Sequence, residues 1–327
     1  MTMIESRKKT DRRKTFASTA TKVVQQVTCA AGIVLVSQLL YIRITTPRLP
    51  PPPKSAHEFE SDGLVVDWSL QNIEEETFIG EQNLKKREEL CIILLGDSPV
   101  EGIGNETHHD ALGGQTALAF SRQYNRPVRY WAYGKSGLTA AGIQNEMVPL
   151  MEGISKKYKI DVVIVSCGVN NVLSGQSPGE FGKDVDLLLD SICSVQNDRN
   201  CKSFEVLMLG LLDFSVMPFL PRPLNYVLGW RSRALRDEME NVINRRQDNQ
   251  GIWTKMSSLQ LKLSIATIPD MTEILEKGSQ HPLLEHATNV GDQKLTRDDL
   301  FATDGFHPAK YGTTLAGTLL ARTYSSG

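Results

Sequence analysis

The most constraining feature of this chain is an uncharged apolar run at residues 91–95 that stops at a glycine. The run contains two isoleucines and two leucines, and with Gly96 behind it the pattern predicts a strand buried on both faces of a parallel sheet. Asp97 and Ser98 follow at once. Because open α/β sheets bind ligands outside the carboxyl ends of their strands, Ser98 stands where such a sheet places a reactive group. A Gly-Asp-Ser triplet is also an ordinary turn sequence, so the rest of the chain has to decide its role.

Apolar runs and amphipathic segments alternate from residue 89 to the end of the chain. Further strands are expected at 128–133, 161–167, 204–212 and 259–267, and helices at 113–124, 139–157, 180–196, 230–247 and 308–323. Strands that alternate with helices of this length form right-handed βαβ units, with helices on both faces of the sheet. We therefore predict one α/β domain over residues 89–327, a three-layer α/β/α fold around a parallel sheet.

An uncharged stretch of twenty residues, 23–42, precedes this domain, although it contains three glutamines. A helix of that length rises about 30 Å, the thickness of the hydrocarbon core of a bilayer. Seven Lys or Arg lie in residues 1–22, and the positive-inside rule then places the N-terminus in the cytoplasm and the domain in a lumenal or extracellular space. We predict a basic tail (1–22) and a single-pass membrane anchor (23–42). The alternatives are a cleaved signal peptide of a secreted protein and an organelle-targeting peptide.

Residues 43–88 are expected to be a linker between the anchor and the domain. Five prolines fall within residues 47–53 and predict a semi-rigid polyproline II stalk, and an acidic, irregular segment follows. Residues 1–22 carry a net charge of +5, which leaves −7 for the remainder of a chain whose formal charge is −2. A mildly acidic body is a poor match for nucleic acid, so no nucleic-acid partner is expected.

The loops after the first three strands and the segment before the last helix together hold the groups that acyl transfer needs. The Ser98 hydroxyl is a weak nucleophile until a base takes its proton, and His307 is the candidate base. Asp304, three residues earlier, can orient the imidazole. The oxyanion of a tetrahedral intermediate needs preorganised donors, for which we expect the backbone N–H groups of Ser98 and Gly137 and the side-chain amide of Asn170.

These four sequence blocks, in this order, resemble the SGNH (GDSL-type) hydrolase family over roughly residues 90–323. The resemblance implies a flavodoxin-like sheet with strand order 2-1-3-4-5, and it implies neither a cofactor nor a metal ion. The residues that match the catalytic positions of the family are Ser98 as nucleophile, His307 as base, Asp304 as its partner, and Gly137 and Asn170 as oxyanion donors.

Two positions depart from the family pattern. Asn171 stands where the family usually has aspartate, and Trp131 stands where many members have asparagine. Neither position has a catalytic role in the family, so the expected chemistry is unchanged.

The leading interpretation is a serine esterase that cleaves carboxylic esters through a covalent acyl-enzyme. The apolar segment Phe214–Trp230 is expected to line an acyl pocket or form a lid beside Ser98, which together with an anchor favours a lipid-like ester; ordinary core packing is the alternative. A second interpretation is a membrane-anchored carbohydrate O-acyltransferase acting on an acylated glycan, since the acceptor that outcompetes water decides between hydrolysis and transfer. A third is a non-catalytic binding module on the same fold.

Two features bear on the compartment. Cys193 and Cys201 flank a polar loop and could form a disulfide in an oxidising lumen. Asn105 begins a glycosylation sequon close to the expected active site. Both features fit a lumenal domain, and neither requires one.

Overall fold

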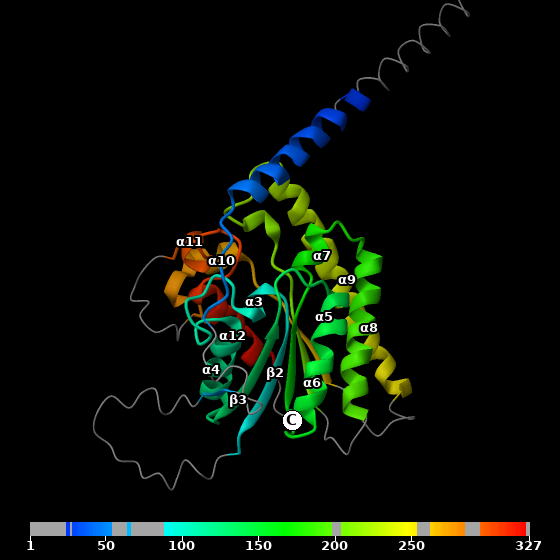
Figure 1. The fold of residues 1–327 in the computed structure, drawn as a ribbon, viewed down its shortest axis with the longest axis vertical. Helices are drawn as coiled ribbons and strands as arrows, with labels where there is room; N and C mark the ends of the chain where they lie inside the picture. The colour runs from blue at the N-terminus through cyan, green and yellow to red at the C-terminus, as the bar shows by residue number, and fades with distance from the viewer. Residues whose placement is uncertain are drawn as a thin grey trace, which may run out of the picture.

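The structure, a computed structural model, describes residues 24–26, 28–53, 64–66, 88–197, 204–253, 262–284 and 295–324. A central sheet is covered by helices on both of its faces (Figure 1). This arrangement confirms the predicted three-layer α/β/α fold.

The sheet formed by the described residues has six strands in the order β1-β3-β2-β4-β5-β6. Their bounds are β1 (Leu64–Val66), β2 (Leu90–Gly96), β3 (Val128–Gly134), β4 (Val162–Ser166), β5 (Glu205–Leu209) and β6 (Lys262–Ala266). Strands β2 to β6 pair in parallel, and their order, with β2 counted as the first strand, is 2-1-3-4-5. Strand β1 adds an antiparallel edge to β3 that the sequence analysis did not expect, since it lies in the segment assigned to a linker.

Strand β2 lies inside the sheet, between β3 and β4, and every one of its seven residues is buried. Successive side chains of a strand point to opposite faces of the sheet. Accordingly, Ile92 and Leu94 pack into the apolar cluster on one face, and Ile93 and Leu95 pack into the cluster on the other. A strand with no polar position can exist only between two apolar layers, which explains the double-sided cover.

Helices α4 (Leu112–Tyr124) and α12 (Lys310–Thr323) contribute to one of these clusters. The opposite face is covered by α5 (Ala140–Glu146), α6 (Val148–Ser155), α8 (Pro178–Asn197) and α9 (Leu224–Trp253). Shorter elements follow the carboxyl ends of the strands or connect the longer helices: α3 (Ser98–Glu101), α7 (Val169–Leu173), η2 (Phe214–Val216), α10 (Met271–Lys277), η3 (Gly278–Gln280) and α11 (Arg297–Leu300).

Two expected helices have different bounds in the structure. The helix predicted at 139–157 is divided at Met147, because Pro149 lacks the N–H that would continue the helical hydrogen bonds. Helix α9 begins at Leu224 rather than at residue 230, so the second half of the apolar segment Phe214–Trp230 is helical.

In the part of the chain that the structure describes, one helix is long and apolar enough to cross a membrane, Val24–Thr45, with a mean hydropathy of 1.8 over its most apolar window. A signal sequence shares this length and composition. The segment that follows does not stand away from the domain as a stalk. Pro52 is buried against Gly102, and Leu49 lies beside Gly104.

Candidate active site

Ser98 is placed by the sharp turn between β2 and α3. Gly96 ends the strand, Asp97 is the N-cap residue, and Ser98 is the first residue of the short helix. A Cβ atom on Gly96 would lie 2.5 Å from Cγ2 of Val100 and 2.8 Å from the carbonyl oxygen of Ser166. Only glycine therefore lets the chain turn here, and the turn leaves Ser98 at the carboxyl edge of the sheet.

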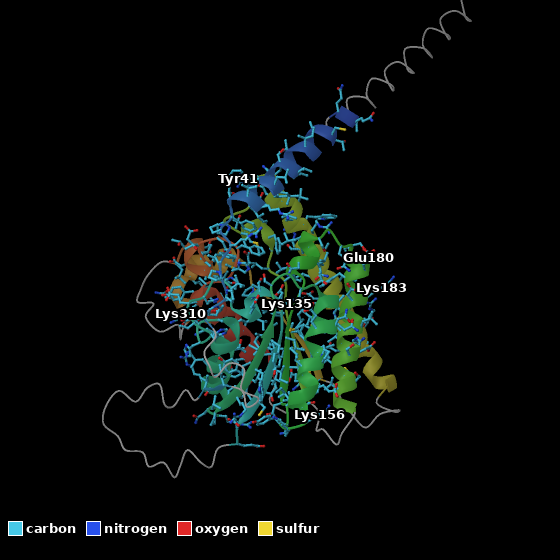
Figure 2. The ribbon with its side chains drawn as sticks, viewed as in Figure 1. Tyr41, Lys135, Lys156, Glu180, Lys183 and Lys310 are labelled. Atoms are coloured by element: carbon cyan, nitrogen blue, oxygen red, sulfur yellow. The ribbon has the colours of Figure 1, made fainter. Side chains whose placement is uncertain are left out.

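The register of the strands brings three loops together at that edge. Gly96 of β2 lies opposite Gly134 of β3 and opposite Ser166 of β4. The loops that follow these residues carry Ser98, Gly137 and Asn170, and Figure 2 shows Lys135 of the middle loop just beyond the ends of the strands. The first, second and third sequence blocks are therefore neighbours in space.

Two of the expected oxyanion donors are free. The backbone N–H groups of Ser98 and Gly137 have no hydrogen-bond acceptor among the described residues. Gly137 has a φ of +87°, and nothing lies within 4 Å of the position that a Cβ atom would take. The backbone there can point its N–H at open space, a conformation that glycine adopts without strain.

The third expected donor is engaged. Nδ2 of Asn170 donates to the carbonyl oxygen of Leu138 at 2.9 Å and to Oδ2 of Asp97 at 3.2 Å. Because an amide nitrogen carries two hydrogens, Asn170 can donate to an oxyanion only after it releases one of these acceptors. These two bonds join the loops after β2, β3 and β4 into one unit.

Glu101 is a supporting residue that the sequence analysis missed. Its carboxylate, at the end of α3, accepts a hydrogen bond of 2.6 Å from the backbone N–H of Ser136, next to Gly137. The approach requires glycine at position 134, where a Cβ atom would lie 2.1 Å from the backbone nitrogen of Glu101. No local sequence signal identifies this pair, because the contact depends on the register between β2 and β3.

Asp304 and His307 form a hydrogen-bonded pair within one tight turn. Nδ1 of His307 lies 2.6 Å from Oδ2 of Asp304, and Oδ1 of the same carboxylate accepts from the backbone N–H groups of Phe306 and His307. Burial alone would raise the pKa of Asp304, but the hydrogen bonds from the His307 ring and the two amides together hold it below its ordinary value. The ionised carboxylate accepts from Nδ1–H, which leaves Nε2 of His307 as the proton acceptor.

The turn that carries His307 packs beside the Ser98 loop. A Cβ atom on Gly104 would lie 3.0 Å from Cβ of His307, and the side-chain amide of Asn105 donates to the carbonyl oxygen of Pro308 at 3.1 Å. Ser98 and His307 line the same pocket. The structure thus brings the fourth sequence block to the nucleophile block from more than 200 residues away in the sequence.

A family profile for the GDSL-like lipases and acylhydrolases matches residues 92–320, which is more than half of the chain. The chain belongs to this family. It is accordingly a hydrolase that acts on esters. No curated protein sequence matches the chain closely enough to count as a relative.

Solved structures with a similar arrangement include three esterases. A family 3 carbohydrate esterase of Clostridium thermocellum is 14% identical, with 72% of this chain and 95% of that chain covered and a TM-score of 0.46. A carbohydrate acetylesterase of Sinorhizobium meliloti is 13% identical (71% and 97% covered, TM-score 0.45), and an aryl esterase of M. smegmatis is 12% identical (71% and 97%, TM-score 0.46). Likenesses of this size say nothing about the substrate of this chain.

The pocket of this GDSL-like hydrolase has a volume of about 130 Å³ and is mostly apolar. Its walls come from the loops after β4 and β5, from the segment Leu300–Phe301 and from the start of α12. Of the segment Phe214–Trp230 only Met217 lines it. Phe219 instead packs edge-on against Phe306, with 5.0 Å between ring centres, and Leu224 is buried in the core. Met217 therefore lines the pocket, whereas Phe219 and Leu224 follow the alternative of ordinary packing.

Asp97 of the hydrolase is fully buried behind the nucleophile. Burial raises its pKa to about 7, although Ser166 and Asn170 both donate hydrogen bonds to its carboxylate. Asn171, which replaces the aspartate usual in the family, is also buried. Its Oδ1 accepts from the backbone N–H of Ala140 at 3.2 Å, and its amide nitrogen donates to Gln176. Asn171 thus connects the start of α5 to α7.

The structure also describes the surroundings of the sequon and of Cys193. Asn105, the sequon residue, is buried, and its amide nitrogen, the atom to which a glycan would attach, is the one bonded to Pro308. Cys201 lies outside the described residues, so a disulfide with Cys193 stays a prediction. Within the described ranges no group of three His, Cys, Asp or Glu side chains lies close enough to hold a metal ion.

Proposed function

We propose that the chain is a serine esterase in which Ser98 is the nucleophile and His307 the general base. The observation that carries this proposal is the pocket, because Ser98 and His307 line it together while Asp304 is hydrogen-bonded to Nδ1 of the imidazole. A serine, an oriented histidine and free backbone donors beside one apolar pocket are the requirements of acyl transfer.

In the proposed reaction Oγ of Ser98 attacks the ester carbonyl and its proton passes to Nε2 of His307. The Asp304 carboxylate stabilises the imidazolium. The oxyanion accepts from the N–H groups of Ser98 and Gly137, and Asn170 becomes a third donor by releasing Asp97, the more distant of its two acceptors. Collapse expels the alcohol, which takes the proton from His307. Water then attacks the acyl-enzyme while His307 takes its proton. The acid is released as that proton returns to Oγ of Ser98.

The size of the pocket favours a short acyl group. Its volume is about 130 Å³, and a cavity of about 150 Å³ in another protein holds a benzene molecule. A space of this size takes an acyl chain of a few carbons. We therefore propose a short-chain ester of a larger alcohol, with the alcohol outside the pocket.

We also propose that the helix Val24–Thr45 anchors the enzyme in a membrane. Its length and hydropathy suffice for a single crossing. The excess of basic residues before it favours a cytoplasmic N-terminus and a lumenal or extracellular active site. On this proposal residues 43–88 connect the anchor to a hydrolase domain of residues 89–327 and add strand β1 to the edge of its sheet.

The test is labelling of the full-length chain in detergent micelles with a fluorophosphonate, which reacts with activated serines. Wild-type protein is expected to label, and Ser98→Ala and His307→Ala are expected to abolish the signal with thermal unfolding unchanged. Ser194→Ala, an exposed serine on α8, is the matched control and should label as wild type does. A folded wild-type protein that does not label, or labelling that survives Ser98→Ala, would refute the proposed nucleophile.

A further inference from the structure

One side of the helix Val24–Thr45 is in contact with the hydrolase domain. Leu35, Gln38 and Ile42 lie on one side of the helix and are its partly buried positions. Leu35 and Ile42 pack against the apolar core. The Gln38 side chain donates to the carbonyl oxygen of Arg222 at 2.6 Å and accepts from the backbone N–H of Leu224 at 3.3 Å. Figure 1 shows the helix meeting the domain beside the first turns of α9.

The length of the helix then limits where the domain can lie. The part that precedes the first contact, residues 24–34, rises only about 16 Å, roughly half of a hydrocarbon core. A complete crossing that begins at Val24 uses the docked turns as well and ends near Arg43. Gln38 then lies about 7 Å below the edge of the hydrocarbon. Its hydrogen bonds to Arg222 and Leu224 therefore hold these two residues at the boundary between the hydrocarbon and the interfacial layer.

The surface around this contact has the composition of a membrane interface. Tyr226 and Trp230, one turn apart on α9, are exposed by 54% and 64%, and Val227 beside them is also exposed. The only charged residue between positions 214 and 230 is Arg222, whose guanidinium stacks over the ring of Tyr226. Tyrosine, tryptophan and arginine are typical of protein surfaces seated at lipid headgroups. The nearby carboxylate of Asp213, beside Gly229, is paired with Arg233 at 2.6 Å.

The C-terminal end of the helix and the residues after it also carry an exposed tyrosine and arginines. Figure 2 shows Tyr41 close to where the helix meets the domain, and this side chain is exposed by 64%. Arg43 and Arg48 follow, and neither they nor Arg222 form an ion pair with any described residue. Positive charge at this level suits the phosphates of lipid headgroups.

We propose that the first turns of α9, with Tyr226, Val227 and Trp230, form a membrane-docking surface that rests in the interfacial layer of the bilayer crossed by the helix Val24–Thr45. The occupant of this exposed apolar surface is therefore lipid. In this arrangement the domain is seated on the bilayer with one defined face, instead of moving freely on a flexible stalk.

The docking surface lies close to the loops that carry the proposed active site. The chain that leaves the helix passes Gly104 with Leu49 and covers Gly102 with Pro52, and Gly104 is in turn adjacent to His307. On the other side, Met217 lines the pocket five residues before Arg222. The active site consequently lies close to the headgroups, which favours esters carried by membrane-resident or membrane-bound molecules. This consequence rests on the proposed esterase function, whereas the docking itself does not.

The test uses the full-length chain in phosphatidylcholine nanodiscs whose acyl chains carry bromine, a quencher of tryptophan, either close to the headgroup or close to the chain end. Of the two tryptophan side chains that the structure describes, Trp230 is exposed on the proposed surface and Trp131 is buried. We expect stronger quenching by the bromine close to the headgroup, and loss of most of that difference in Trp230→Phe. The matched control is Trp131→Phe, which removes a buried tryptophan of the core and should leave the difference intact.

Quenching that is unchanged in Trp230→Phe would overturn the docking surface, and so would quenching that is equal at both bromine depths. Labelling the same nanodiscs with a fluorophosphonate separates this result from the proposed function. Protein that shows Trp230-dependent quenching without labelling supports the docking surface and refutes the esterase. Labelling without Trp230-dependent quenching refutes the docking surface alone.

Discussion

At the scale of single residues, Asp97 is an ionisable side chain in a fully buried position. It completes the turn that presents Ser98, and it is a carboxyl group without access to water. Hydrogen bonds from Ser166 and Asn170 do not offset the cost of burying its charge, so its pKa rises from 3.8 to about 7. The folded protein therefore holds a proton at Asp97 over a pH range in which the unfolded chain has lost it.

Replacing Asp97 by asparagine should remove this dependence. The contribution of Asp97 to the free energy of unfolding of the wild type is expected to fall as pH rises from about 4 to about 7, because only the folded state retains the Asp97 proton there. Asp97→Asn keeps the shape without the charge and should be more stable than wild type by a few kcal/mol at pH 8, at about 1.4 kcal/mol for each unit of the pKa shift. At pH 4 the two proteins should be equally stable.

Urea unfolding of the full-length chain in detergent from pH 4 to pH 8 measures this difference. Asp304, whose pKa is lowered, affects stability only as pH falls below its ordinary value, so it does not contribute in this window. Parallel curves for wild type and variant would contradict a raised pKa at Asp97.

Met217 is the residue of the apolar segment that should set the acyl-chain preference. It lines the pocket, whereas Phe219, two residues later, packs on Phe306. Met217→Ala should lengthen the preferred chain by about two carbons, because truncating a methionine removes about three heavy atoms from the wall. Relative kcat/KM over a series of nitrophenyl esters from acetate to decanoate measures the preference. Phe219→Ala is the comparison, and an equal shift in both variants would contradict this assignment.

At the scale of elements, the contact between α4 and α12 depends on glycine. A Cβ atom on Gly317 would lie 2.8 Å from backbone atoms of Gln115 and Thr116, so the two helices approach at this point almost backbone to backbone. Local helix propensity disfavours glycine in this position. Packing between two covering helices outweighs that preference, because the closeness of the two backbones leaves no room for a side chain.

Gly317→Ala should therefore destabilise the protein although alanine is the better helix former. We expect a loss of about 1–3 kcal/mol, typical of overpacking. Gly153→Ala in α6 is the matched control, since nothing lies within 4 Å of its Cβ position and the site is exposed. That substitution should stabilise by about 0.5–1 kcal/mol. Denaturant midpoints of both variants measure the contrast, and a gain in stability for Gly317→Ala would show that the helices can separate without cost.

The elements also show where sequence patterns stop being informative. The strand at 91–95 was predictable because a short uncharged apolar run that ends at a glycine is typical of a buried strand. Strand β1 was not, because its three residues gain their strand geometry only by pairing with β3. The early start of α9 at Leu224 follows from contacts with η2 and with the N-terminal helix rather than from the local pattern.

At the scale of the whole molecule, the position of the N-terminal helix on the domain depends on one polar side chain. Gln38 is hydrogen-bonded to Arg222 and Leu224 from within an otherwise apolar helix. These bonds fix both the rotation of the helix and its height along the domain. A glutamine that counted against a membrane span in the sequence thus has a defined structural partner.

Gln38→Leu should loosen this attachment without unfolding the domain. The backbone N–H of Leu224 loses its acceptor, and its hydrogen exchange should become about five-fold faster or more, since a hydrogen bond contributes on the order of 1 kcal/mol. Gln26→Leu, on an exposed position of the same helix, is the control and should leave that rate unchanged. Exchange measured by mass spectrometry on the full chain in detergent tests this, and equal rates in the two variants would contradict the docking contact.

The sequence by itself determined the α/β class and the parallel sheet, because these follow from hydrophobic periodicity. It also singled out Ser98, Asp304 and His307 as the proposed catalytic residues, since a strand–glycine–serine turn and a DxxH turn are local features. The tertiary structure decided which of these groups meet. Strand register places Glu101 against the Gly137 loop and Asn170 against Asp97, and chain packing selects Met217 for the pocket wall. Such contacts join residues far apart in the sequence, and no local pattern encodes the distance between them.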